Sequence, residues 1–600
     1  MRAAKSYMIE DEVLGKAYDT RLARRLYGFL RPYRHYILLA TLALLASSAC
    51  QLAGPYLIKV ALDNHITTGA LEGFWKLLWL YLVVIGGDFL FRFVQIYLTN
   101  FLGQKTMYDL RMALFRHLQN LSLSFFDRNP VGRLVTRATT DIEALNQLFS
   151  TGLVTVIGDL AMIFGIMIVI LWLNFKLALV TFSILPLLLA VTFYFRRKMR
   201  EGFRMVRIRI ARINSFLQEA LSGMAIIQLF NRQDKSWKRF DELNQDHMQA
   251  HLYTVFYYAL FFPLIELIAS ISMAIILWYG GLRVMDGALT FGVLVAFIQY
   301  VEKFYKPISD LSEKYNIFQA AMAASERIFG LMDTHESIQS PPAPVYRDRL
   351  AGKVTFRNVH FAYNQDEPVL KGISFEILPG EKIAIVGATG AGKTTIINLL
   401  CRFYDPQQGE ILIDGIDIRK LDKTWLRTNI GLALQDVLIF SGTVKSNIAL
   451  GLKTSSIQRV IASAEAVGAL DFIEKLPGGV DYLLTERGSN LSTGQRQLLS
   501  FARVMYKNPR ILVLDEATSS VDSHTEHLIQ QALERLITRR TSLIVAHRLS
   551  TIRHVDRIIV MHHGQIVETG SHQELLERKG IYFNLYQLQY RDQEITVTER

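Results

Sequence analysis

Residues 387–394 read Gly387-Ala388-Thr389-Gly390-Ala391-Gly392-Lys393-Thr394. They follow the β-rich run KIAIV and precede TIINLL, which has the composition of a helix. A glycine-rich loop between a strand and a helix turns its backbone amides around phosphates, and the helix N-terminus adds positive field. The lysine reaches the outer phosphates, and the hydroxyl after it is a magnesium ligand. The stretch is therefore a Walker A motif rather than an ordinary glycine-rich turn, because all eight positions match in the required context.

The Walker A motif lies in a region where short β-rich runs alternate with helical segments. These runs include KVTFRNVHFAY, ILVLDEA, TSLIVAHRL and RIIVMHHG. Such alternation predicts an α/β domain with a largely parallel central sheet, over residues 354–590. The hydropathy falls near residue 335, and the proline-containing stretch SIQSPPAPVYRDRLAGK indicates a linker, which we place at residues 321–353. Residues 591–600 are interpreted as a C-terminal tail.

A second buried strand, residues 511–514, ends at the paired carboxylates Asp515 and Glu516. In a nucleotide site the first carboxylate holds magnesium, directly or through water, and the second polarises the attacking water. An acidic pair after a strand is by itself just as typical of a solvated helix start. Its position downstream of a Walker A motif favours the catalytic interpretation.

The first half of the chain contains six apolar stretches, each near the length of about 20 residues that crosses a bilayer. They are Tyr36–Ala61, Phe74–Leu98, Thr151–Leu173, Leu177–Phe195, Thr254–Gly280 and Leu289–Tyr305. The first is too long and too far from the N-terminus for a cleaved signal peptide, so it is interpreted as a retained span. Residues 36–320 are thus predicted to form a membrane domain of six transmembrane helices.

The distribution of Lys and Arg predicts the orientation of these spans. The connection at residues 63–73 has no Lys or Arg, whereas residues 196–239 contain twelve. By the positive-inside rule the basic connections face the cytoplasm, together with residues 1–35, which include an amphipathic elbow helix. The two long basic connections have helix composition and are expected to continue the spans as helices beyond the bilayer. Breaks at residues 127–132 and 222–223 would turn each hairpin.

The positive charge also needs an explanation, because a net charge of +12 is compatible with nucleic-acid binding. Residues 1–340 hold 35 Lys or Arg against 26 Asp or Glu, and residues 341–600 hold 31 against 28. Most of the surplus therefore lies in the membrane half, where it fixes orientation and meets anionic lipid headgroups. No nucleic-acid partner is expected. Cys50 and Cys401 fall in different domains, which excludes a disulfide framework.

Residues 490–497 read NLSTGQRQ, for which a generic P-loop enzyme has no use. The stretch resembles the LSGGQ signature of the ATP-binding cassette (ABC) family. Further family marks occur in the expected order, namely Tyr363 before the Walker A motif, Gln435 in LALQDVLIF, Ser520-Val521-Asp522 after Glu516, and His547 in VAHRLST. With the six spans, the resemblance is to ABC exporters of the multidrug and lipid-flippase type and covers nearly the whole chain.

The resemblance implies ATP and Mg²⁺ as cofactors and a role for each matching residue. Tyr363 would stack on adenine, Glu516 would be the general base or water-positioning group, and Gln435 would link the γ-phosphate or metal to the membrane domain. The residues implied in catalysis are Glu516, His547, Gln435 and Lys393. Those implied in nucleotide binding are Tyr363, Gly387, Ala388, Thr389, Gly390, Ala391, Gly392, Lys393, Thr394, Thr395, Ser492, Gly494, Gln495 and Asp522. Those implied as metal ligands are Thr394, Gln435 and Asp515.

The implied function is ATP-driven export or flipping of hydrophobic or amphipathic compounds by alternating access. The chain would be one half of a dimer, because in this family each ATP lies between one Walker A motif and the partner's signature. The hairpin tips near residues 126–132 and 223–232 would dock on the cassettes. The expected location is a bacterial inner or plasma membrane, with the N-terminus and the ATPase domain in the cytoplasm. An ATP-regulated channel or receptor is the alternative, and an importer is less favoured.

Thr493 departs from the family signature, because it adds a β-branched side chain where glycine is usual. Since Glu516 is kept, this combination resembles one member of an asymmetric heterodimer. A heterodimer is therefore favoured over a homodimer in which threonine is simply tolerated.

Substrate identity is not encoded in any motif. Asp88, Asp159 and Glu266 lie within predicted spans, where carboxylates face a cavity or a partner group. They could attract cationic amphipathic compounds. The favoured alternative is structural: Asp88 and Arg92 are four residues apart on one helix and can pair, and Asp159 can lie near the interface.

Overall fold

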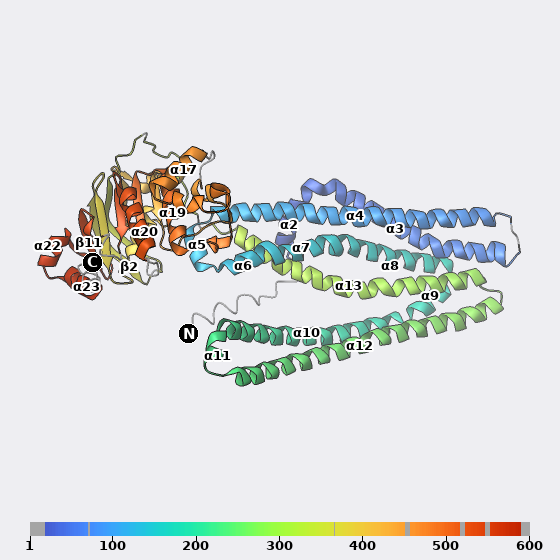
Figure 1. Cartoon of the computed structure of the whole chain (residues 1–600). Coiled ribbons are helices and arrows are strands. Elements are labelled where there is room, and N and C mark those ends of the chain that lie inside the picture. Colours follow the sequence, from blue (N-terminus) through green and yellow to red (C-terminus); the bar gives the residue numbers. More distant parts are fainter. Residues whose placement is uncertain are drawn as a thin grey trace. The chain divides into compact units, whose positions relative to one another are not determined.

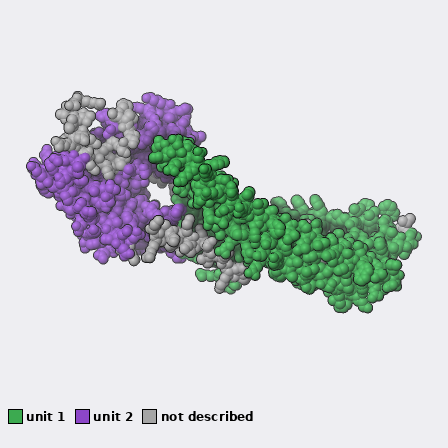
Figure 2. Space-filling model, turned by 90° about the horizontal axis from the view of Figure 1, so that it is seen from below, with its two compact units in different colours: residues 1–119, 131–334 green, residues 120–130, 335–600 purple. Residues whose placement is uncertain are grey.

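The computed structural model describes residues 19–69, 72–335, 337–347, 349–364, 366–450, 456–515, 523–546 and 552–589. The chain separates into two compact units, which Figure 2 shows in different colours. The first unit holds residues 1–119 and 131–334, and the second holds residues 120–130 and 335–600. Segment 120–130 thus packs with the second unit although it interrupts the sequence of the first.

The first unit is helical. Its shorter helices are α2 (Thr20–Leu30), α6 (Val131–Thr136), α7 (Ile142–Gln147), α9 (Phe175–Phe182) and α11 (Met224–Leu229). Its longer helices are α3 (Arg34–Ala61), α4 (Phe74–Asn120), α8 (Val154–Leu173), α10 (Leu185–Ser222), α12 (Gln233–Met285) and α13 (Phe291–Met332). The 47 residues of α4 extend about 70 Å at about 1.5 Å per residue, more than twice the hydrocarbon thickness of about 30 Å. The long helices therefore continue well beyond a bilayer.

Five helical segments among the described residues are long and apolar enough to cross a membrane. They are Thr20–Ile66, Phe74–Asn120, Val131–Leu173, Phe175–Ser222 and Gln233–Met285, and they contain the first five predicted spans. The sixth predicted span, Leu289–Tyr305, lies in α13 from Phe291 onward, and it carries Glu302 and Lys303. Its assignment as a span stays a prediction.

Helix α13 occupies a central place in the first unit. It packs against α3, α8 and α12, while α10 runs beside α12 (Figure 1). The amphipathic helix α2 buries Leu26 and Leu30 in a cluster shared with α4 and α13. The guanidinium of Arg25 donates two hydrogen bonds, of 2.6 and 2.8 Å, to the carboxylate of Asp333 just after α13. Helix α2 is thereby anchored at the end of α13.

The helical hairpins turn at the positions that their sequences indicate. Helix α10 ends at Ser222, Gly223 follows, and the short α11 precedes α12. In the other hairpin α5 (Leu123–Arg128) and α6 are separated by Asn129 and Pro130. Proline interrupts a helix because it lacks the backbone donor and restricts the residue before it.

The second unit has two main sheets. The central one has strand order β12-β11-β3-β10-β9-β6, with β12 antiparallel to β11 and the other described pairs parallel. Its strands are β3 (Lys382–Gly387), β6 (Ile430–Ala433), β9 (Ile511–Asp515), β10 (Thr541–Val545), β11 (Arg557–His562) and β12 (Gln565–Gly570). An antiparallel sheet of order β2-β1-β4-β5 comprises β1 (Val354–Ala362), β2 (Pro368–Ile377), β4 (Gln408–Ile413) and β5 (Ile416–Asp417). The α/β prediction is confirmed.

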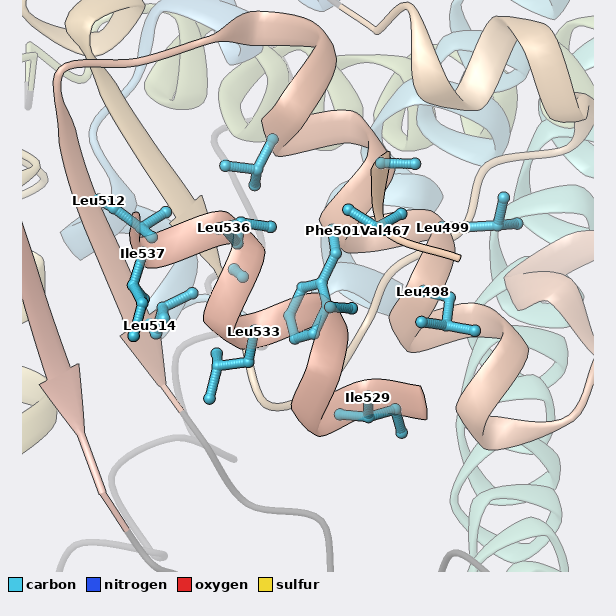
Figure 3. Packing of buried hydrophobic residues seen from close by; sticks show 14 of the residues in the cluster. Val467, Leu498, Leu499, Phe501, Leu512, Leu514, Ile529, Leu533, Leu536 and Ile537 are labelled. Atoms are coloured by element: carbon cyan, nitrogen blue, oxygen red, sulfur yellow. The ribbon is translucent and has the colours of Figure 1, made fainter. Parts of the chain in front are cut away.

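The second unit also contains helices. They are α14 (Lys393–Leu400), α15 (Lys423–Asn429), α16 (Val444–Ile448), α17 (Ile457–Ala466), α18 (Leu470–Glu474), α19 (Thr493–Lys507), α20 (Ser523–Ile537), α22 (His572–Glu577) and α23 (Ile581–Gln589). Some of them (α14, α15, α19, α22 and α23) pack on strands of the central sheet, whereas α16 and α17 pack on α19. Figure 3 shows apolar side chains of α19 and α20 meeting those of β9, such as Phe501, Leu536 and Leu514. This core fixes α19, and with it the signature residues at its N-terminus, to the sheet.

Candidate functional site

The Walker A loop joins β3 to α14, as the sequence predicts. Gly390 and Gly392 have φ angles of 84° and 99°, a region that glycine adopts at little cost. A Cβ atom on Gly387 would lie 2.3 Å from the backbone oxygen of Met561. The loop therefore requires glycine at these three positions. The amide of Ala391 donates to the carbonyl of Ala388 at 3.1 Å, which closes the turn.

Lys393 is the first residue of α14 and only 7% exposed. Its ammonium donates to the backbone oxygens of Gly387 at 2.7 Å and Ala388 at 3.1 Å, so the side chain curls over the loop. Burial lowers the pKa of Lys393, and the nearby carboxylate of Asp515 opposes that shift. Thr394, the next residue, is exposed. A cation beside a carboxylate and a hydroxyl is the arrangement expected around magnesium and phosphate.

The carboxyl ends of three strands meet beside this loop. Strand β10 pairs in parallel with both β3 and β9, and Val545 lies opposite Ile385 on one side and Asp515 on the other. Asp515, the last residue of β9, is thus placed at the same edge as the Walker A loop. Glu516 directly follows Asp515, and His547 comes two residues after Val545. Glu516, His547 and Asp522 themselves lie outside the described residues.

Tyr363 lies just past β1, next to the Walker A helix. Its hydroxyl donates to Oγ1 of Thr395 at 3.3 Å and accepts from Nδ2 of Asn398 at 3.1 Å. The side chain is 39% exposed, so its hydroxyl is tied to α14 while part of the ring stays open. An exposed, positioned aromatic ring beside a phosphate loop is suited to stacking on a base.

Helix α19 begins at the signature sequence. Ser492 is its N-cap and forms a capping box with Gln495, in which each side chain accepts from the other residue's backbone amide. Gly494 is buried in the first turn. Thr493 is exposed, has no positive φ, and accepts a hydrogen bond of 3.1 Å from Arg496. The unusual threonine is therefore accommodated without backbone strain.

Gln435 is exposed two residues after β6, the strand beside β9. It lies at the same sheet edge as Asp515, but no hydrogen bond of its side chain is seen among the described residues. Those sequence-predicted residues that the structure describes thus fall into two groups within the second unit. One comprises the Walker A loop, Asp515 and Tyr363, and the other lies at the start of α19.

Comparison with known proteins identifies both halves of the chain. Residues 37–308 match the family described as the ABC transporter transmembrane region, and residues 370–519 match the family described as ABC transporter. A relative from Bacillus subtilis, the uncharacterized ABC transporter ATP-binding protein YknV, is 38% identical over 97% of both chains. The ATP-dependent lipid A-core flippase of Syntrophus aciditrophicus is 37% identical over 95% of both chains.

The chain belongs to the ABC transporter family.

A third relative, the fatty acid ABC transporter ATP-binding/permease protein of Mycobacterium bovis, is 39% identical over 82% of this chain and 78% of its own. These matches confirm the predicted class, an ABC half-transporter of exporter type in one chain. The ABC transporter described here is accordingly an integral membrane protein that couples ATP hydrolysis to transport.

Several residues of the ABC transporter's nucleotide-binding unit were missed by sequence reasoning. The Gln407 side chain accepts from the amide of Ala362 at 2.7 Å and donates to its carbonyl at 2.9 Å, which clamps the backbone next to Tyr363. Asn398 and Tyr404 also contact Tyr363. Gln407 and Asn398 belong to no motif, so nothing in the sequence alone distinguishes them from surface amides.

The intramembrane carboxylates of the ABC transporter have structural partners in two of three cases. Asp88 accepts from Ser47 at 2.5 Å and from Gln51 at 3.0 Å, both on α3, so the predicted pairing with Arg92 on its own helix is not what the structure shows. Asp159 on α8 is paired with Lys314 on α13. The exposed Glu266 has no partner among the described side chains.

Proposed function

We propose that this ABC transporter exports or flips hydrophobic or amphipathic compounds across a bacterial inner or plasma membrane. One observation carries the proposal: residues 120–130, which directly continue the membrane-spanning α4, pack within the unit that holds the Walker A loop. A nucleotide-dependent change in that unit therefore has a direct covalent and packed route to a membrane helix. ATP can shift such an equilibrium only by binding one conformation more tightly than the other.

In the proposed site Tyr363 stacks on adenine, the Walker A amides and Lys393 bind the phosphates, and Thr394 and Asp515 hold Mg²⁺. The oxygen-only character of the last two side chains suits a hard cation, which would neutralise charge developing on the phosphates. Glu516 positions or deprotonates the attacking water. His547 contacts the γ-phosphate, and Gln435 connects the phosphate or metal to the membrane unit.

The complete assembly is proposed to be a dimer in which Ser492, Gly494 and Gln495 of one chain face the nucleotide bound to the Walker A loop of the other. The N-terminus of the 15-residue α19, with its capped first turn, supports this role because helix N-termini bind anions. Asp522 would contribute at the same interface, and the exposed apolar helix α11 would dock on a cassette of the dimer. The exposed residues of that helix and its flank include Ile226, Leu229 and Phe230.

A heterodimer remains our proposal for the partner, on the ground of the LSTGQ signature together with Glu516. Thr493 fits its helix without strain. The threonine alone is therefore weak support, and expression of the single chain decides the question. A chain that purifies alone as a monomer with little ATPase activity supports the heterodimer. A stable dimer of this chain with substrate-stimulated ATP hydrolysis refutes it.

Substrates of an amphipathic kind are supported by the names of relatives, which include a lipid A-core flippase, a fatty acid transporter and a putative multidrug export protein. The proposed orientation places the N-terminus and the nucleotide-binding unit in the cytoplasm. It is supported by the basic composition of residues 196–239.

The decisive experiment is transport into inside-out vesicles containing the full-length protein, with and without candidate partner half-transporters. A panel of lipids, drugs and fatty acids is offered with ATP, and the Lys393→Ala variant serves as the matched control. ATP-dependent accumulation that the variant lacks supports export. ATP hydrolysis without vectorial movement of any compound, together with an ATP-gated conductance, would instead establish the alternative of a regulated channel.

A further inference from the structure

Three aromatic rings meet edge to face beside the Walker A helix. The ring centroid of Tyr404 lies 5.1 Å from that of Tyr363 and 5.5 Å from that of Phe361, with interplanar angles of 88° and 71°. Phe361 and Tyr363 are 4.9 Å apart at 90°. Phe361 and Tyr404 are buried, whereas Tyr363 is half-exposed. The buried rings of Phe361 and Tyr404 thus both pack edge to face with the ring of Tyr363, an arrangement favoured by the aromatic quadrupole.

The other end of Tyr404 contacts a different part of the second unit. Its hydroxyl donates a hydrogen bond to the carboxylate of Asp127 in α5. Burial, together with this hydrogen bond, raises the pKa of Tyr404, so the hydroxyl keeps its proton throughout the physiological range. Phe125 of α5 is buried in the same unit. Helix α5 is therefore seated by an apolar anchor and by one charge-assisted hydrogen bond, which is stronger than a neutral one.

A single side chain consequently bridges the two elements that the proposed mechanism must couple. Only residues 121 and 122 separate α5 from the membrane-spanning α4. Tyr363 presents the ring on which adenine is proposed to stack. Movement of α5 away from its seat would release the Tyr404 hydroxyl and allow its ring, and hence the edge of Tyr363, to shift.

We propose that Tyr404 is a positioning residue that couples the docking of α5 to recognition of the adenine base. The proposal rests on the proposed role of Tyr363 as the adenine platform. Coupling between two binding events is reciprocal. Seating of α5 therefore raises the affinity for adenine, and binding of adenine holds α5 in place by the same factor. Binding of the base, and not only of the phosphates, thereby affects the segment that leads into the membrane-spanning α4.

The first test separates the base from the phosphates. Equilibrium affinities are measured on the full-length protein in lipid nanodiscs with Mg²⁺ and either AMP-PNP or inorganic tripolyphosphate, which has no base. Tyr404→Phe keeps the ring and removes only the donor, and Asp127→Asn alters the acceptor. Both variants are expected to weaken AMP-PNP binding about fivefold, at the low end of couplings between sites, and tripolyphosphate binding less than about twofold. Tyr346→Phe, at a tyrosine that is 61% exposed, is the matched control.

If Tyr404 has a purely structural role, the variants weaken the binding of both ligands equally or of neither ligand. Either result overturns the proposal. The Tyr363→Ala variant then distinguishes a wrong assignment of the adenine platform from a missing coupling through Tyr404. If Tyr363→Ala leaves AMP-PNP binding unchanged, the platform itself is wrong. If it weakens AMP-PNP binding, the coupling predicts that Tyr404→Phe has no further effect in the Tyr363→Ala background, and an additive effect refutes it.

Hydrogen exchange tests the reverse direction on the same samples. AMP-PNP is expected to slow exchange of the amides in residues 120–130 of the wild-type protein, whereas tripolyphosphate is not. The slowing should be absent in Tyr404→Phe. Equal protection by AMP-PNP in the wild type and in this variant would refute a link through Tyr404, even if the transporter hydrolyses ATP and exports its substrate normally.

Discussion

Neutralising either member of the Asp159–Lys314 pair is expected to destabilise the membrane unit without selectively abolishing transport of cationic compounds. Lys314 on α13 donates to Asp159 on α8, and the two side chains are 15% and 18% exposed. The carboxylate is therefore already engaged by a cation from the same chain. This pairing favours a role in holding two helices together over a role in attracting a substrate.

The magnitude follows from this partial burial. Removing one partner of a fully buried pair costs about 3–5 kcal/mol, whereas exposed pairs contribute about 0.2–1 kcal/mol. With more than four-fifths of each side chain covered, Asp159→Asn or Lys314→Gln is expected to lower the free energy of unfolding by about 2 kcal/mol. The double variant should cost clearly less than the two single costs added, because it leaves no unpaired charge.

The assay is unfolding of the purified transporter in mixed micelles titrated with SDS, in a double-mutant cycle, with Glu266→Gln as the control. That residue is exposed on α12, so its neutralisation should change stability by less than about 0.5 kcal/mol. Uptake of a cationic and a neutral dye is compared in the same variants. Additive single effects would refute the pairing. Selective loss of cationic transport in a stable Asp159→Asn protein would refute the structural role.

Three further predictions follow from other contacts. Gly392→Ala is expected to weaken ATP binding at least about tenfold, because φ is 99° there and an L-residue in left-handed geometry costs about 1–2 kcal/mol; near-native ATPase activity would contradict this. Asp141→Asn should lower the unfolding midpoint, because Arg327 donates to both oxygens of this carboxylate, whose side chain is only 6% exposed. Arg327→Lys, which keeps the positive charge, should lower the midpoint less than Asp141→Asn does. A hydrogen bond from the backbone amide of Trp425 holds the pKa of Asp422 below its usual 3.8. The ionised carboxylate therefore stabilises the fold at neutral pH, and this contribution is lost as the pH falls through the lowered pKa. In an unfolding series from pH 7 to 2, Asp422→Asn should lose less stability on acidification than the wild type.

Local patterns allowed the nucleotide site to be predicted, since the phosphate loop depends on eight consecutive residues and two flanking elements. The strand–loop–helix context of Lys393 and the position of Asp515 at a strand end are confirmed. The roles of Glu516, His547 and Asp522 stay predictions. The place of Tyr363 before the Walker A motif predicts its role in adenine binding, which stays a prediction. The side chain that holds its backbone could not be predicted, because Gln407 lies 44 residues further along the chain and carries no motif of its own.

Side-chain pairs between different helices could not be predicted from the sequence, for a different reason. Helical spacing offered Asp88 a partner four residues away on its own helix, but its actual donors lie on α3. A partner at four residues can be proposed from sequence because helical geometry fixes it, whereas a partner on another helix depends on how the helices pack. Lys314 could not have been matched with Asp159, 155 residues earlier, for the same reason.

The helix that contains most of the sixth predicted span, α13, carries polar side chains that bond to neighbouring helices. Helix α13 is not among the five described segments that are apolar enough to cross a membrane, yet it packs against α3, α8 and α12. Its polar side chains Tyr300, Lys303 and Lys314 fall on one stripe at helical spacing, and each donates to another helix: the first two to backbone carbonyls of α3 and the third to Asp159 on α8. A helix whose polar groups are satisfied by neighbours does not need an apolar surface all round, because those neighbours and not lipid surround it. The polar residues of α13 that the structure describes are therefore consistent with a helix enclosed by neighbours over part of its length. Lys303→Leu is expected to lower the stability of the unit in the same SDS titration, because it removes the hydrogen bond to the backbone oxygen of Gln51.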